Sequence, residues 1–203
     1  MKIGLDFDNT IVSYDRLFHA VAIEQKLIPG DLAVSKLAVR DHLRAVDQED
    51  AWTEIQGYVY GKRMSEAQAY PGVGEFLRSA RDASVDLYIV SHKTRHPFIG
   101  PRYDLHVAAR AWVDTQLQDE QGPLIPPANV FFELTKDAKL QRITSLGCDW
   151  FLDDLPEILL APGFPLDTQA ILFDFAGIHT NANDMKYVSS WREMQCLLLQ
   201  RPT

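Results

Sequence analysis

The sequence predicts an α/β fold: a parallel sheet flanked by helices, with a small all-helical cap inserted near the amino terminus. From about residue 70 onward, short apolar runs alternate with helical patterns, and the runs are continuously apolar, as in strands buried on both faces. Residues 15–69 show helical spacing without a strand signal and are too long for a simple crossover. We therefore expect an α/β core from residues 1–14 and 70–203 and a helical cap from residues 15–69.

The first predicted strand is the apolar run from Ile3 to Phe7, which ends at two carboxylates and a turn marked by Asn9. The insertion that follows divides into roughly three helices, because the Pro29-Gly30 pair and the acidic stretch 47–50 interrupt its periodicity. Its aromatic residues are expected to form the core of the cap rather than to stack on a ligand. These aromatic residues are Trp52, Tyr58 and Tyr60.

The rest of the chain alternates between the two kinds of element. We predict further strands at residues 85–90, 129–132, 149–152 and 169–175, and helices from Val73 and at residues 104–118, 137–146 and 190–200. The helix at 104–118 is expected to turn Val107, Ala111 and Trp112 inward, and the last helix begins with a Ser190–Glu193 capping box.

Polar residues follow several of the predicted strands, where an open parallel sheet places its ligand site. Asp6 and Asp8 end the first strand, Ser91 the second, and the Asp153-Asp154 pair the fourth. Two neighbouring carboxylates repel each other unless a positive charge lies between them, and Mg²⁺ with oxygen ligands would resolve that conflict. The alternative for Asp6 and Asp8 is a strand end followed by an Asx turn, with both acids solvated.

Composition limits the possible functions. The chain has 203 residues, 46% of them hydrophobic, enough for one full core with a small inserted subdomain. Its formal net charge of -8 argues against a large nucleic-acid footprint, which needs a basic face. No apolar run approaches the length of a membrane span, no signal-peptide pattern is present, and the two cysteines have no metal-ligand spacing. We expect a cytoplasmic protein that binds neither membrane nor nucleic acid.

Four short motifs, in order and at predicted strand ends, resemble those of the haloacid dehalogenase (HAD) superfamily phosphohydrolases. Residues 6–10 match the DxDxT motif, Ser91 the second, a lysine at a helix start the third, and Asp153-Asp154 the fourth in its DD form. The insertion between the first two motifs has the position of a C1-type cap. The resemblance spans about residues 1–175 and implies a Rossmann-like core and Mg²⁺-dependent phosphoryl transfer.

The resemblance also implies roles for the acids. Asp6 would be the nucleophile that forms an aspartyl-phosphate, and Asp8 would protonate the leaving oxygen and then activate water. Dehalogenases of this superfamily lack an acid at the place of Asp8, so the chain resembles the phosphoryl-transfer members. Mg²⁺ would be bound by Asp6, the Asp8 carbonyl and Asp154, with Asp153 supporting it through water.

The lysine and the phosphate-binding groups complete the expected site. Lys136 and Lys139 both lie at the start of the helix at 137–146, and Lys139 is preferred because it directly precedes the apolar stripe at Leu140; both could instead be solvated. Ser91 would hydrogen-bond a phosphate oxygen, and Thr10 would brace the loop.

The basic loop at residues 92–102 follows the second motif. We expect it, with His92 and Lys93 at its start, to bind a second anionic group of the substrate, although an ordinary solvated loop explains the pattern equally well. A later polar loop containing His179, Asn181, Asn183 and Asp184 is explained adequately by turn residues.

The leading hypothesis is a phosphatase acting on a small cytosolic phosphomonoester. A phosphotransferase using a non-water acceptor and a non-catalytic binding module with the same fold are the alternatives. The presence of Asp6, Asp8, Ser91 and the Asp153-Asp154 pair argues against the non-catalytic module. Neither the particular metabolite nor the oligomeric state can be read from the sequence.

Overall fold

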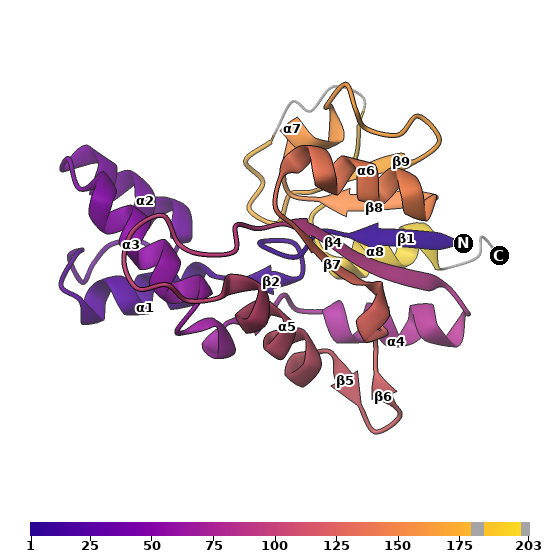
Figure 1. The fold of residues 1–203 in the computed structure, drawn as a ribbon, viewed down its shortest axis with the longest axis horizontal. Helices are drawn as coiled ribbons and strands as arrows, with labels where there is room; N and C mark the ends of the chain where they lie inside the picture. Colours follow the sequence, from indigo (N-terminus) through magenta and orange to yellow (C-terminus); the bar gives the residue numbers. More distant parts are fainter. Residues whose placement is uncertain (180–184, 200–203) are drawn as a thin grey trace. The chain divides into compact units, whose positions relative to one another are not determined.

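The fold is described from a computed structural model, which describes residues 1–179 and 185–199 (Figure 1). The chain divides into two compact units. One consists of residues 1–11, 69–93 and 116–203, and the other of residues 12–68 and 94–115. The sequence had suggested that residues 94–115 would fold with the α/β core, whereas here they group with the helical segment.

The first unit is built on a six-stranded sheet in which every pair of neighbouring strands is parallel, which confirms the predicted fold class. The spatial order of the strands is β10-β9-β8-β1-β4-β7. Their bounds are β1 (Lys2–Leu5), β4 (Asp86–His92), β7 (Val130–Glu133), β8 (Trp150–Asp153), β9 (Gln169–Phe173) and β10 (Lys186–Val188). The strand order reverses direction between β1 and β8, which is where open α/β sheets bind their ligands.

Helices of this unit pack against both faces of the sheet. Their bounds are α4 (Val73–Asp82), α6 (Lys136–Leu146), α7 (Pro156–Leu159) and α8 (Trp191–Leu198). Leu172 of β9 belongs to the buried cluster that contains Ile143 of α6 and Ile158 of α7. The next residue, Phe173, lies 6.0 Å from Trp191 of α8, ring centroid to ring centroid. Since successive strand residues point to opposite faces, α6 and α7 cover one face and α8 the other.

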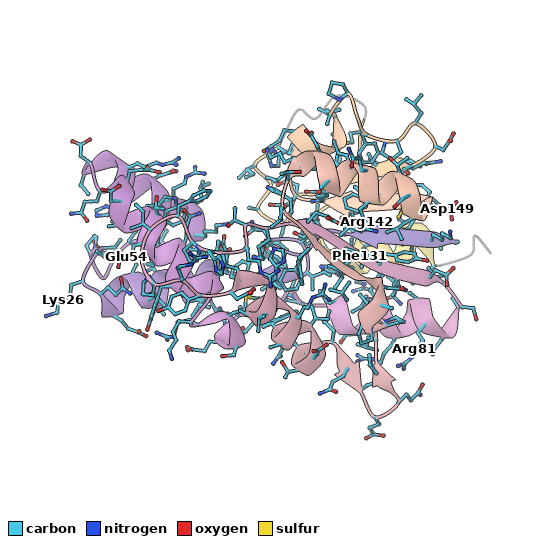
Figure 2. The ribbon with its side chains drawn as sticks, in the orientation of Figure 1. Lys26, Glu54, Arg81, Phe131, Arg142 and Asp149 are labelled. Atoms are coloured by element: carbon cyan, nitrogen blue, oxygen red, sulfur yellow. The ribbon has the colours of Figure 1, made fainter. Side chains whose placement is uncertain are left out.

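Helix α6 is attached to the edge strand β7 by an arginine. The Arg142 guanidinium lies over the Phe131 ring, with its Cζ 4.5 Å from the ring centroid, and its Nε donates to Glu133 Oε1 at 2.7 Å (Figure 2). Lys139 is three residues earlier on the same helix, so this attachment also restrains the turn that carries Lys139.

The second unit contains the three helices predicted for the insertion, α1 (Asp15–Glu24), α2 (Lys36–Ala45) and α3 (Glu49–Tyr60), and a short 3₁₀ turn, Met64–Glu66. Of the three aromatic residues expected in its core, Trp52 is buried and lies 5.2 Å from Phe18 between ring centroids, whereas Tyr58 and Tyr60 are only half-buried. Helix α5 (Leu105–Gln116) is attached to this unit by Trp112, whose Nε1 donates to the Ala67 carbonyl at 2.9 Å.

Several details differ from the sequence predictions. Helix α5 buries Leu105, Ala109, Trp112 and Val113, whereas Val107 and Ala111 are exposed, because the helix lies in a different rotation from the expected one.

Strand β9 ends at Phe173 rather than at residue 175, and three short pieces were not anticipated. These are β10 and the two-stranded pairs β2 (Val12–Ser13) with β3 (Gln68–Ala69) and β5 (Gln118–Asp119) with β6 (Gly122–Pro123). Strands of two or three residues leave no detectable period in a sequence. The remaining 3₁₀ turn is Pro127–Asn129. None of the helices in the described parts of the chain is long and apolar enough to cross a membrane.

Candidate active site

Strand register brings the first and fourth motifs together at the carboxyl edge of the sheet. Leu5 of β1 pairs with Leu152 of β8, so the residues that follow them, Asp6 and Asp153, are level with each other. The Asp6 N–H donates to the Leu152 carbonyl at 2.8 Å, which continues the ladder one residue further. Both carboxylates are buried. Hydrogen bonding between adjacent strands therefore places acids that are far apart in sequence in one cluster.

Lys139 lies between these two acids. Its Nζ is 2.6 Å from Asp6 Oδ1 and 2.6 Å from Asp153 Oδ2, and its side chain is completely buried. Lys136, one turn earlier on α6, is exposed and pairs with Glu157 at 3.2 Å. Of the two lysines considered from the sequence, Lys139, the preferred one, contacts the acidic cluster, whereas the described partner of Lys136 is Glu157.

The helix start explains how a lysine can occupy this position. Thr135 caps α6, its side-chain oxygen accepting from the Ala138 N–H at 3.1 Å. An ammonium group near a helix amino terminus opposes the helix dipole, and here two carboxylates compensate for that cost.

The charges of the cluster are unbalanced. Burial lowers the pKa of Lys139, but the charges of Asp153 and Asp6 and their hydrogen bonds outweigh that effect, so the pKa is raised above the ordinary lysine value. Burial raises the pKa of Asp153 to about 7; the charge of Lys139 opposes this rise and the charge of Asp6 adds to it. Lys139 thus stays charged, while one ammonium does not fully neutralise two buried carboxylates.

A third acid completes a set of oxygen ligands. Asp6, Asp153 and Asp154 each offer a carboxylate oxygen, and these atoms lie within 4.8 Å of one another. The Leu155 N–H donates to Asp153 Oδ1 at 3.0 Å, which orients that carboxylate. An all-oxygen donor set with excess negative charge fits a hard divalent cation such as Mg²⁺. The Asp8 carboxylate is not part of this group; its expected contribution was the backbone carbonyl.

Asp8 forms an ion pair instead. Its Oδ2 lies 2.6 Å from the Nζ of Lys93, the residue that directly follows β4. The Lys93 side chain is 4% exposed and that of Asp8 is 21% exposed, so the carboxylate is the partner nearer to solvent. The Lys93 ammonium also lies 6.0 Å from the centroid of the Phe7 ring.

The other expected substrate-binding residues border the same strand ends. Ser91 is buried, and it follows Ile89, the β4 partner of Leu5, by two residues. His92 is partly buried, and its pKa is lowered by burial and by the positive charge of Lys139. Thr10 is fully buried, and its hydroxyl forms no hydrogen bond with the described residues.

A tryptophan that sequence reasoning did not select holds the loop after Asp8. Trp191 Nε1 donates to the Thr10 carbonyl at 3.1 Å, and both residues are completely buried. These residues are 181 positions apart, so only an alignment of homologues or a structure could connect them.

The basic loop at 92–102 is divided between the two units, with Lys93 ending one segment and Thr94 beginning the other. Arg95 pairs with Asp104 at 3.0 Å, and His96 Nδ1 is 3.0 Å from the Tyr103 carbonyl. Both basic side chains therefore have local partners. In the later polar loop, Asn181, Asn183 and Asp184 lie outside the described residues.

No protein-family model and no curated protein matches this sequence. Solved structures do match it, over nearly the whole chain. A predicted phosphatase from Clostridium acetobutylicum is similar with a TM-score of 0.63 and 15% identity, covering 98% of this chain and 97% of the other. An L-2-haloacid dehalogenase matches with a TM-score of 0.60 and 13% identity, covering 97% of each chain.

A third match is a HAD family hydrolase from Deinococcus radiodurans, solved with bound phosphate and sodium. Its TM-score is 0.58 and its identity 16%, over 97% of this chain and 94% of the other. The chain has the fold of the HAD superfamily. The HAD-like neighbours are hydrolases of more than one kind, so the reaction is inferred from the residues of the site and not from the fold.

Proposed function

We propose that this HAD-like protein is a Mg²⁺-dependent phosphatase that hydrolyses a small phosphomonoester through an aspartyl-phosphate on Asp6. The observation that carries the proposal is the joint placement of Asp6, Lys139 and the Asp153-Asp154 pair at the reversal point of the sheet. A phosphate dianion can approach this many carboxylates only if positive charge accompanies it, and one buried lysine and one divalent cation would supply that charge.

Each residue then has one task. Lys139 binds Asp6 through Oδ1 and orients the carboxylate, so that Oδ2 attacks phosphorus while the bond to the ester oxygen breaks. Asp8 enters the reaction protonated on Oδ1, while its Oδ2 contacts Lys93, and gives that proton to the departing oxygen, which leaves Asp8 as a carboxylate. In the second half, Asp8 takes a proton from water as the water oxygen attacks phosphorus, which releases inorganic phosphate and restores Asp6.

Ser91, His92 and Thr10 are proposed to bind or brace the phosphoryl group from the neighbouring strand ends. Asp6, Asp153 and Asp154 would hold the Mg²⁺ ion, which when bound would neutralise charge on the phosphoryl oxygens. Phosphomonoester hydrolysis is very slow without catalysis, so charge placed in advance is the main requirement for such a site.

The dehalogenase reaction is the competing possibility, because dehalogenases are among the neighbours. Asp8 favours phosphoryl transfer, because displacement of halide ion needs no proton donor whereas an ester oxygen does. The three-carboxylate group favours it too, since a haloacid brings no phosphate dianion that would need a divalent cation.

The test is hydrolysis of 4-nitrophenyl phosphate with and without Mg²⁺, alongside halide release from 2-chloropropionate. We expect Mg²⁺-dependent phosphate release, no halide release, and loss of activity in Asp6→Asn. Metal-independent halide release would overturn the proposal. Added alcohols would distinguish hydrolysis from phosphotransfer, because a phosphotransferase would form a new ester in place of inorganic phosphate.

The expected substrate remains a small phosphorylated metabolite in the cytoplasm. The acidic net charge of -8 supports a small-molecule substrate over a nucleic acid. A screen of sugar phosphates, nucleotides and phosphorylated carboxylic acids would identify its class.

A further inference from the structure

We infer that Lys93 is a positioning residue for Asp8: it holds the proton-transferring carboxylate in one orientation and does not bind the substrate itself. This inference rests on the proposed function and replaces the substrate contact that the sequence suggested for Lys93. It is carried by the ion pair between Lys93 Nζ and Asp8 Oδ2, at 2.6 Å.

Burial shows which partner meets the solvent. The Lys93 side chain is 4% exposed and the Asp8 side chain 21%, so a molecule arriving from solvent reaches the carboxylate first. A lysine that binds a substrate anion needs an ammonium that solvent can reach. The Lys93 ammonium is instead less exposed than the Asp8 carboxylate that it contacts.

The Lys93 side chain is held at both ends. Its backbone N–H donates to the Glu133 carbonyl at 2.7 Å, which anchors it to the end of β7. Its ammonium lies near Phe7, whose ring in turn packs edge-on against Phe132 of β7 at 5.2 Å between centroids. A charge fixed in this way restricts the rotamers of the acid it binds.

Orientation matters for Asp8 because proton transfer needs the donor or acceptor oxygen within hydrogen-bond reach of the reacting atom. Asp8 lies in the loop directly after β1, next to Asn9, which has a positive φ of 59°. Without Lys93, the carboxylate would sample several rotamers, and a displacement of about 1 Å can cost about 100-fold in rate.

The inference predicts an effect that depends on Asp8. Lys93→Met should lower kcat for 4-nitrophenyl phosphate by roughly 10- to 100-fold with KM changed by less than about threefold. The same substitution in an Asp8→Asn background should change kcat by less than about twofold, because the group that Lys93 positions is no longer there. Lys93→Arg should recover part of the lost activity.

A second readout separates positioning from general damage to the fold. The loss in Lys93→Met should be larger for an alkyl phosphate than for 4-nitrophenyl phosphate, because a poorer leaving group depends more on a well-placed proton donor. The matched control is Lys186→Met, which removes a surface lysine of the same unit that donates to Gln169 at 3.0 Å; its activity should be unchanged.

Direct substrate binding by Lys93 predicts the opposite pattern, with a raised KM and a loss that persists in the Asp8→Asn background; that result overturns the inference. The inference is also overturned if Lys93→Met loses the same fraction of kcat for all leaving groups and has a lowered melting temperature. If Lys93→Met does not fold, Lys93→Gln and Lys93→Arg are compared with the wild type instead, each with and without Asp8→Asn. An inactive wild type would overturn the proposed function and this inference together. If the wild type is active but Lys93→Met still lowers kcat in the Asp8→Asn background, this inference alone is overturned.

Discussion

Lys139 is the residue on which the candidate site depends most directly. It is completely buried and contacts two buried carboxylates, so its ammonium is part of a desolvated network rather than of a surface pair. Surface pairs contribute little to stability, whereas breaking a buried pair leaves uncompensated charge inside the protein.

Lys139→Met should therefore lower the free energy of unfolding by about 3–5 kcal/mol and abolish the proposed hydrolysis. Lys136→Met removes an exposed lysine of the same helix and should change stability by less than about 0.5 kcal/mol. Urea unfolding and the hydrolysis assay measure both variants. Equal effects of the two substitutions would show that the two lysines are equivalent, contrary to their different burial.

The two cysteines offer a separate residue-level test of burial. Cys148 is buried and Cys196 is exposed. Burial raises the pKa of the Cys148 thiol to about 11, so both access and thiolate formation are unfavourable at pH 8. We expect a disulfide reagent to label one thiol in the native protein and the second only after denaturation. Cys196→Ser should remove the native-state reaction, and fast labelling of that variant would contradict the buried placement of Cys148.

At the scale of secondary-structure elements, helix α8 has a role beyond closing the fold. Its first residue, Trp191, packs against Phe76 of α4 at 5.1 Å between ring centroids and donates its ring N–H to Thr10. The last helix of the chain is thus connected to the loop that follows the first strand and carries Asp8.

Trp191→Phe keeps an aromatic ring but removes the hydrogen bond, leaving the buried Thr10 carbonyl without that donor. We expect a stability loss of about 1–3 kcal/mol and a fall in kcat of roughly tenfold.

Trp112→Phe is the matched control for Trp191→Phe, because Trp112 makes the same type of bond to the Ala67 carbonyl in the helical unit. It should cost similar stability with little change in kcat. Chemical denaturation and steady-state kinetics would measure both variants. An equal fall in kcat in the two would indicate a general packing effect rather than support of the Asp8 loop.

At the scale of the whole molecule, the proposed metal site should contribute to folding stability. The native state brings three carboxylates together within 4.8 Å, and the unfolded chain does not. A ligand that binds only the native state stabilises it according to its concentration.

Mg²⁺ at about 100 times its dissociation constant should raise the free energy of unfolding by about 2.7 kcal/mol, and EDTA should reverse the effect. Asp154→Asn should abolish this stabilisation, whereas Asp167→Asn, which changes an exposed acid, should retain it. Thermal unfolding with Mg²⁺ or EDTA measures the effect without relying on activity. Stabilisation that persists in Asp154→Asn would place the ion elsewhere.

The fold class was predictable because its signals are local. A continuously apolar strand such as Ile3–Phe7, the breaks near Pro29 and Asp47, and the Ser190–Glu193 capping box act within a few positions. Elements of two or three residues, such as β2 and β10, were missed because pairing with a neighbouring strand, rather than their own sequence, makes them strands.

By itself, the sequence determined the order of the elements, the presence of a helical insertion and the set of acids at strand ends, because periodicity and turn residues depend on near neighbours. Only the tertiary structure decided that Lys139 rather than Lys136 joins Asp6, 133 positions away, that Lys93 binds Asp8, and that Trp191 supports Thr10. Such pairings depend on strand register and helix rotation, and a shift of one residue in either would change every partner while leaving the sequence pattern almost the same.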